Sequence, residues 1–194
     1  MSSGPELAIA LKLRLPHSDN IAFDQIADGA RKYRGFELGD QEKGFLVISH
    51  QDYELYIYTM EGFDQGDVDK EHSIILLEAD MDDVLDEDDT PDFWKAYQNV
   101  IAMVVAQTNP LFGITSDSET IIEMIKEGLH KYLSLGVYFS FDFIKATIPK
   151  CEDTIKKNAS RELQYGYLVP GMMMSESKAK RYIRDMKRNL GEEQ

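Results

Sequence analysis

Carboxylates that could bind a metal ion are concentrated between residues 78 and 92. The first four of them are Glu78, Asp80, Asp82 and Asp83. Clustered carboxylates bind hard cations such as Ca²⁺ and Mg²⁺, but an EF-hand loop also needs a glycine at its sixth position. Counted from Asp80, that position holds Leu85. We therefore interpret the segment as a solvated acidic connection, and we favour no metal and no cofactor. If a metal ion did bind, these four carboxylates would be the candidate ligands.

Residue types used in catalysis are present, but not at the spacing of a known motif. None of the histidines His17, His50, His72 and His130 has the H-E-x-x-H spacing of a zinc protease helix. Neither the G-x-S-x-G nucleophile elbow nor a glycine-rich phosphate-binding loop occurs. The sequence therefore favours a non-catalytic role. The enzymatic alternative is a metal-assisted hydrolase that uses carboxylates of residues 78–92 with His50 or His72.

The single cysteine, Cys151, narrows the chemistry further. One cysteine excludes an internal disulfide and the cysteine-rich zinc frameworks. A Cys–His nucleophile would have to be assembled by the fold, because no histidine neighbours Cys151 in the sequence.

Hydroxyl groups gather before a predicted helix that spans residues 118–133. They belong to Thr115, Ser116 and Ser118, which follow Gly113. The free N–H groups of a helix start can hold an anion, but Asp117 and Glu119 already place negative charge there. We expect ordinary helix capping, with Glu119 in a capping box.

The formal net charge of −14 is distributed unevenly along the chain. Residues 61–92 contain fourteen acidic residues and one base, Lys70, whereas residues 145–188 contain eleven lysines and arginines against five acids. Such a field repels polyanions and steers basic partners toward the acidic region. We expect a protein partner, or self-association through the two oppositely charged segments. Nucleic acid binding is disfavoured.

A basic amphipathic helix is predicted from about residue 176 to residue 190. Its apolar stripe is Ala179, Ile183, Met186 and Leu190. Three consecutive methionines precede it, and methionine side chains suit adaptable contact surfaces. The candidate binding residues of this region are Met172, Met173, Met174, Lys180 and Arg184. A helix of this kind can bind an acidic partner or a membrane surface, or simply pack on its own sheet.

Aromatic residues recur on predicted strands, where packing is their commonest role. Tyr56 and Tyr58 could nevertheless form a stacking surface. A small-molecule pocket is a second alternative function, and its aromatic lining would be Phe139, Phe141, Tyr165 and Tyr167.

Apolar periodicity predicts the elements that must position these residues. Residues 7–15 alternate strictly and indicate a strand with one buried face. Further strands are predicted at 45–50, 53–60, 72–78, 137–143 and 163–169, and further helices at 18–35 and 90–109. This grouping favours an α+β class, with a largely antiparallel sheet and helices packed mainly on one face. We expect a single α+β domain over residues 1–194, with 108–117 as the place where it could divide.

The longest apolar runs are far shorter than the ~20 residues that span a membrane. No basic flank or apolar block of a signal peptide is present at the amino terminus. We therefore expect no transmembrane segment and a cytoplasmic location. The leading interpretation is an acidic binding or regulatory module that acts through protein–protein contacts, including self-association as a homo-oligomer.

Overall fold

The first strand of the chain lies at the centre of the sheet. The computed structural model describes residues 6–61, 68–80, 90–171 and 174–192. Within them, β1 (Glu6–Lys12) pairs with β5 (Ile74–Asp80) on one side and β6 (Phe112–Asp117) on the other. The expectation of one buried face was wrong. Leu7, Ile9 and Leu11 enter one apolar layer and Ala8 and Ala10 enter a second, because alanine leaves room for a helix to pack closely.

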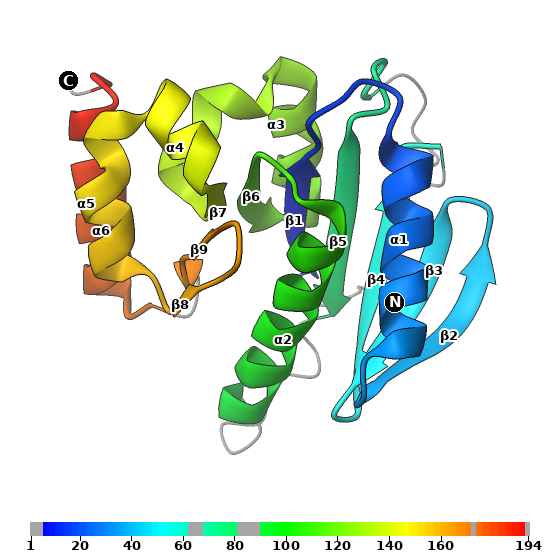
Figure 1. Cartoon of the computed structure of the whole chain (residues 1–194). Helices are drawn as coiled ribbons and strands as arrows, with labels where there is room; N and C mark the ends of the chain where they lie inside the picture. The colour runs from blue at the N-terminus through cyan, green and yellow to red at the C-terminus, as the bar shows by residue number, and fades with distance from the viewer. Residues whose placement is uncertain (1–5, 62–67, 81–89, 172–173, 193–194) are drawn as a thin grey trace.

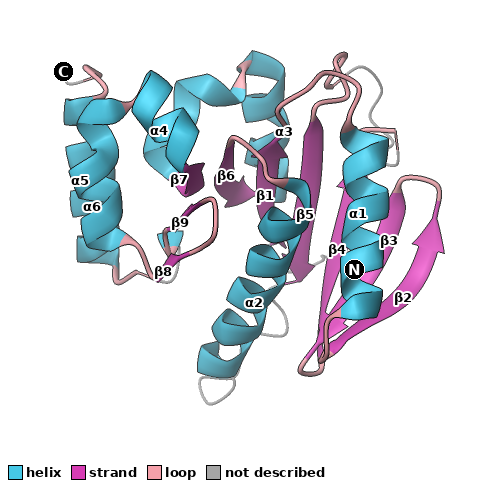
Figure 2. Cartoon of the chain, in the orientation of Figure 1, coloured by secondary structure: helices cyan, strands magenta, loops and turns pink. Residues whose placement is uncertain are grey.

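Nine antiparallel strands form one continuous sheet in the described part of the chain. Their order is β2-β3-β4-β5-β1-β6-β7-β9-β8 (Figure 2). The remaining strands are β2 (Phe36–Glu42), β3 (Phe45–His50), β4 (Tyr53–Thr59), β7 (Gly136–Ser140), β8 (Arg161–Glu162) and β9 (Gly166–Leu168). The α+β class and the antiparallel sheet are confirmed. Residues 112–117, within the predicted point of division, form β6 in the middle of this sheet.

Helices cover the sheet from both faces (Figure 1). Helices α1 (Asp19–Lys32) and α2 (Thr90–Thr108) pack on one face. The other layer contains α3 (Ser118–Glu127), the 3₁₀ helices η2 (Leu129–Leu135) and η3 (Pro149–Cys151), α4 (Phe141–Thr147), α5 (Glu152–Asn158) and α6 (Glu176–Asn189). The sequence-based expectation placed the helices mainly on one face. They divide between two faces because the central strands are apolar on both sides.

Local capping decides where one predicted strand ends. The alternation Val137, Phe139, Phe141 and Phe143 predicted a strand through residue 143, but β7 ends at Ser140. The Ser140 hydroxyl accepts a hydrogen bond from Phe143 N at 3.4 Å and so caps α4. Phe141 and Phe143 therefore lie on a helix, and the strand prediction was wrong at these two positions.

The β3–β4 hairpin is confirmed, and its turn explains its polar break. Gln51 and Asp52 have φ angles of 52° and 68°. A two-residue turn of this left-handed kind matches the twist of the strands that it joins.

Among the described residues, no helix combines the length and the apolar character required to cross a lipid bilayer.

Candidate functional site

Among the described residues, no helix covers one face of β2, β3 and β4. Helices α1 and α2 contact β3 and β4 from the face that carries Leu46, Ile48, Leu55 and Ile57. The opposite face belongs to the side of α3–α6, but the apolar layer built by those helices reaches only as far as β5 and Tyr58. We call this surface the open face. It consists of Glu37, Glu42, Phe45, Val47, Ser49, Glu54, Tyr56 and Tyr58.

Strand register arranges the open face in rows. Glu37 pairs with Ser49 and Ser49 pairs with Glu54, so one row places carboxylates on both sides of a serine. The two glutamates are two strand spacings apart, about 10 Å. The next row pairs Val47 with Tyr56. Pairing therefore brings acidic residues from two separate strands to the same end of the face.

Aromatic rings occupy the part of the open face beyond the Glu37–Ser49–Glu54 row. Phe45 pairs with Tyr58 across the hairpin, and their ring centroids lie 5.1 Å apart. Phe45 also stacks on Tyr56 at 6.2 Å with an interplanar angle of 11°. All three side chains are half-buried. Such cross-strand pairs stabilise a sheet, and the face of an aromatic ring attracts cations.

An acidic hollow adjoins the aromatic rings. It has a volume of about 460 Å³ and includes Glu37, Asp52 and Glu54 among its lining residues. None of the described residues that line it is a lysine or an arginine. None of the three carboxylates forms an ion pair with a described base. The hollow therefore concentrates negative charge that no lysine or arginine in the described part of the chain neutralises.

His50 lines this hollow, and both of its ring nitrogens form hydrogen bonds. This residue, a candidate of the metal-assisted hydrolase alternative, is only 8% exposed. Because Gly35 O can only accept, Nδ1 of His50 donates to it at 2.7 Å, and Nε2 accepts from Asn99 Nδ2 at 3.1 Å. The ring also stacks on Phe36 at 4.4 Å. His50 thus ties β3 to α2 and is not placed to act as a base.

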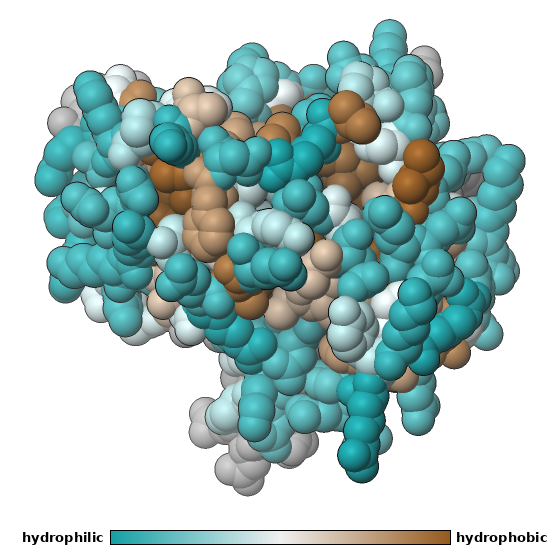
Figure 3. All heavy atoms as spheres, in the orientation of Figure 1, coloured by the Kyte–Doolittle hydropathy of each residue, from teal (hydrophilic) through white to brown (hydrophobic). Residues whose placement is uncertain are grey.

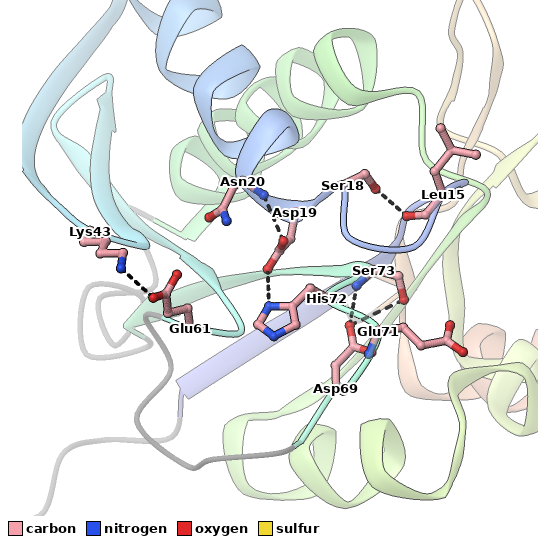
Figure 4. A network of polar contacts seen from close by, with 10 residues as sticks. All are labelled: Leu15, Ser18, Asp19, Asn20, Lys43, Glu61, Asp69, Glu71, His72 and Ser73. Atoms are coloured by element: carbon pink, nitrogen blue, oxygen red, sulfur yellow. Dashed lines mark hydrogen bonds and ion pairs between the residues drawn. The ribbon is translucent and has the colours of Figure 1, made fainter.

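A second polar group joins the β1–α1 connection to the segment before β5 (Figure 4). Asp19 is 1% exposed, and its Oδ2 lies 3.1 Å from Nδ1 of His72. The backbone N–H of Asp19 also donates to the carbonyl of His72. Ser73 Oγ accepts from Lys12 Nζ at 2.7 Å, so this hydroxyl is already engaged. The group holds two connections together, and Asp19 fixes the orientation of the His72 ring.

The predicted metal candidates are only partly within the described residues. Glu78 lies on β5 beside Tyr56 and is 8% exposed, and Asp80 ends the same strand. Asp82 and Asp83 lie outside the described residues. Where the structure describes side chains, no three His, Cys, Asp or Glu residues are grouped as a metal site would require.

The candidate binding residues of the carboxyl-terminal region lie at the other end of the sheet. Lys180 pairs with Glu176 at 2.8 Å, and Arg184 Nε lies 3.6 Å from Asp185; all four side chains are on α6. Met174 packs against the apolar layer, and Met172 and Met173 lie outside the described residues. Figure 1 shows α6 far from β2, so the structure does not bring these residues to the open face.

Other predicted sites turn out to be structural. Burial raises the pKa of Cys151 to about 11, so the thiol stays protonated at neutral pH and cannot serve as a thiolate nucleophile. Phe139 is fully buried, and Phe141 packs edge-on against Tyr167 at 5.0 Å. Tyr165 is 43% exposed, so the four aromatic residues do not converge as one pocket lining.

The predicted capping of α3 occurs through a different residue. The carboxylate of Asp117 accepts hydrogen bonds from Thr120 N at 2.8 Å and Thr120 Oγ1 at 2.7 Å. These bonds lower the pKa of Asp117. The N-cap is therefore Asp117, where the sequence suggested Ser116 with Glu119. The carboxylate of Asp117 therefore already provides the negative charge that the start of a helix attracts.

The surface on the α1 and α2 side is largely hydrophilic (Figure 3). Separate brown patches lie over the β1–α1 connection and α1, the elements that carry the exposed Leu15 and Ile21. Scattered apolar side chains of this kind are normal for a protein surface. The open face differs because its aromatic residues are contiguous and have carboxylates around them.

Sequence reasoning missed the carboxylates of β2. The segment Phe36–Glu42 alternates only at its start, and Gly39 interrupts it before a bulge between Leu38 and Gln41. The available signal was the apolar pair Phe36 and Leu38 around Glu37.

No protein family, curated protein or solved structure matches this chain, so the open face stands as the candidate site on the strength of its own residues.

Proposed function

We propose that this chain is a protein-binding module whose open face takes a lysine- or arginine-bearing segment of another protein. One observation carries the proposal: the rings of Phe45, Tyr56 and Tyr58 share one face of the sheet with the carboxylates of Glu37 and Glu54, without a described base among them, and the Tyr56 hydroxyl lies 3.5 Å from Oε2 of Glu54. This combination supplies both attractions that a cationic side chain can use.

The attraction has two physical sources. A lysine or arginine over an exposed tyrosine gains roughly 0.5–1 kcal/mol from the negative face of the ring. Nearby carboxylates add a charge–charge term, which also accelerates association at low ionic strength. The alkyl part of the same side chain can lie on the ring edges. Tyrosines and arginines are enriched where binding energy concentrates in interfaces.

The edge of the sheet is less suited to this role than the face. The outermost strand, β2, has a bulge between Leu38 and Gln41 and carries Glu37, Asp40 and Glu42. A bulge and like charges on an edge strand oppose pairing with another strand, above all with β2 of a second copy. We therefore expect the partner surface to be positively charged, opposite in sign to the acidic open face.

The test uses a fluorescein-labelled peptide of alternating lysine and leucine and a twin with glutamate in place of lysine. We expect the lysine peptide to bind with a Kd of about 10⁻⁵ M and the glutamate twin to show no saturable binding. In the variant Glu37→Gln/Glu54→Gln, the affinity for the lysine peptide should fall about tenfold, measured by fluorescence anisotropy.

Two matched controls separate the site from general charge and general aromaticity. Glu119→Gln/Glu162→Gln removes two exposed carboxylates away from the open face and should leave the Kd unchanged. Tyr56→Leu should weaken binding several-fold, whereas Tyr33→Leu, at a half-exposed tyrosine after α1, should not. Equal affinity of the two glutamine variants would refute the proposal. Low-salt sedimentation that shows dimers lost in Glu37→Gln/Glu54→Gln would identify the partner as a second copy.

A further inference from the structure

At the opposite end of the sheet, α6 closes over a pocket with a volume of about 180 Å³. Its walls come from β6, η2, the start of β7 and α6. The lining residues are Thr115, Ser116, Ser134, Leu135, Gly136, Gly171, Ala179, Tyr182 and Ile183. None of these residues is charged. The pocket is separate from the open face, which lies on β2–β4.

Glycines explain why space remains here. A Cβ on Gly136 would lie 2.0 Å from Cζ of Phe139, and one on Gly171 would lie 2.7 Å from Val137 Cγ1. Gly171 also has a φ angle of +53°, in the left-handed region. Close packing therefore demands glycine at both positions. Where α6 faces them it presents the small Ala179, so no described side chain fills the gap.

The hydroxyl groups around the pocket are not equally occupied. Thr115 Oγ1 donates to Ala8 O at 3.1 Å, and the Tyr182 hydroxyl donates to Gly136 O at 3.4 Å. Among the described residues the Ser134 hydroxyl has no hydrogen-bond partner, and it is not one of the fully enclosed side-chain atoms, so it is accessible from the pocket that Ser134 lines. A hydroxyl that is accessible from a largely apolar pocket is available to form a hydrogen bond with a ligand group placed there.

We propose that this pocket binds a small neutral molecule that has an apolar ring or branched chain and one hydrogen-bonding group directed at Ser134. Its size is suitable, because an apolar cavity of about 150 Å³ accommodates benzene. Charged ligands are excluded because no lining residue could compensate for their lost hydration. Phenol is the simplest molecule with the required ring and hydroxyl.

The pocket is tested by titrating the full chain with phenol, toluene and benzoate and recording ¹H–¹⁵N correlation spectra. Phenol is expected to shift the backbone resonances of the lining residues saturably, centred on Ser134, Gly136 and Gly171. Toluene should bind about tenfold more weakly because it cannot satisfy Ser134, and benzoate should not bind. Benzoate binding as tight as that of phenol would overturn the proposal, as would shifts that never saturate.

Two variants make the outcome decisive. Ala179→Leu fills the pocket from α6 with a good helix former and should abolish the shifts caused by phenol and by toluene. Ser134→Ala should reduce the affinity for phenol to that for toluene while leaving toluene unaffected. Phenol shifts that persist in Ala179→Leu would refute the site. An unchanged phenol-to-toluene ratio in Ser134→Ala would refute the role of the hydroxyl.

Discussion

Two buried tyrosines show how differently the same hydroxyl can be accommodated. Burial raises the pKa of both Tyr97 and Tyr182 well above the ordinary value, so both stay neutral. The Tyr182 hydroxyl donates to Gly136 O, whereas the Tyr97 hydroxyl on α2 has no hydrogen-bond partner among the described residues. An unsatisfied buried hydroxyl costs about 1–3 kcal/mol. Tyr97 is therefore a position where the fold carries an avoidable penalty.

Removing each hydroxyl should change stability in opposite directions. Tyr97→Phe is expected to raise the free energy of unfolding by about 1 kcal/mol, because it deletes an unpaired polar atom. Tyr182→Phe should lower it by about 1 kcal/mol, because Gly136 O loses its donor. Urea denaturation of both variants measures the difference. A loss of stability in Tyr97→Phe would contradict the assignment and indicate a bound water in the cavity of about 20 Å³ beside Tyr97.

At the scale of elements, Arg14 connects three segments that are distant in sequence. It follows β1, its Nε donates to Asn109 O at 2.8 Å after α2, and its Nη2 lies 2.8 Å from the Asp142 carboxylate on α4. A second guanidinium nitrogen, Nη1, also contacts Asp142. Hydrogen bonding from Arg14 holds the pKa of Asp142 well below its ordinary value. Through Asn109 and Asp142, the Arg14 side chain therefore links the end of β1 to α2 in one layer and to α4 in the other.

The depressed pKa of Asp142 determines the direction in which the free energy of unfolding changes with pH. Asp142 stabilises the fold while it is ionised, so its contribution is present above the unfolded-state pKa of about 3.9 and is lost as pH falls toward the folded value. Asp142→Asn should cost about 1 kcal/mol at pH 7, since the carboxylate is 63% exposed and screened by solvent. The difference from wild type should shrink steadily below about pH 4.

Urea denaturation across this pH range measures that loss, and Asp28→Asn is the matched control. Asp28 forms one exposed contact with Arg31 within α1, so its replacement should cost less at every pH. A pH-independent cost of Asp142→Asn would show that shape, not charge, makes this contact important.

Local signals predicted the elements that depend on nearby residues, and missed those that depend on distant ones. The helices α1, α2 and α6 and the β3–β4 hairpin follow from periodicity, capping and turn residues. The hydroxyl-rich β6 resembles a loop until β1 pairs with it. The open face was only half predictable: Tyr56 and Tyr58 were visible as a stacking surface, but Glu37 joins Glu54 only through the register of three strands.

At the scale of the molecule, the described residues separate acidic and basic surfaces in space. The acidic open face and the β2 edge lie at one end of the sheet, and the basic helix α6 lies at the other (Figure 1). A net charge of −14 also produces repulsion within the folded chain. Screening by salt therefore acts on folding and on partner binding in opposite directions.

Raising NaCl from about 0.05 M to about 0.5 M should separate these effects, because the screening length falls from more than 10 Å to about 4 Å. The melting temperature should rise as self-repulsion weakens, while the affinity for the lysine–leucine peptide should fall about tenfold. Thermal melts and anisotropy titrations in the same buffers provide both values. Peptide affinity that is insensitive to salt would argue for a mainly apolar contact with the rings.

The central place of β1 bears on the order of synthesis. A ribosome delivers this strand before either of its neighbours, and its second neighbour is finished only when Asp117 has been made. Until then one hydrogen-bonding edge of a strongly apolar strand stays unpaired, which exposes it to aggregation. Nascent chains that end before β6 should therefore need chaperone protection, and cooperative folding should begin only after that strand leaves the exit tunnel.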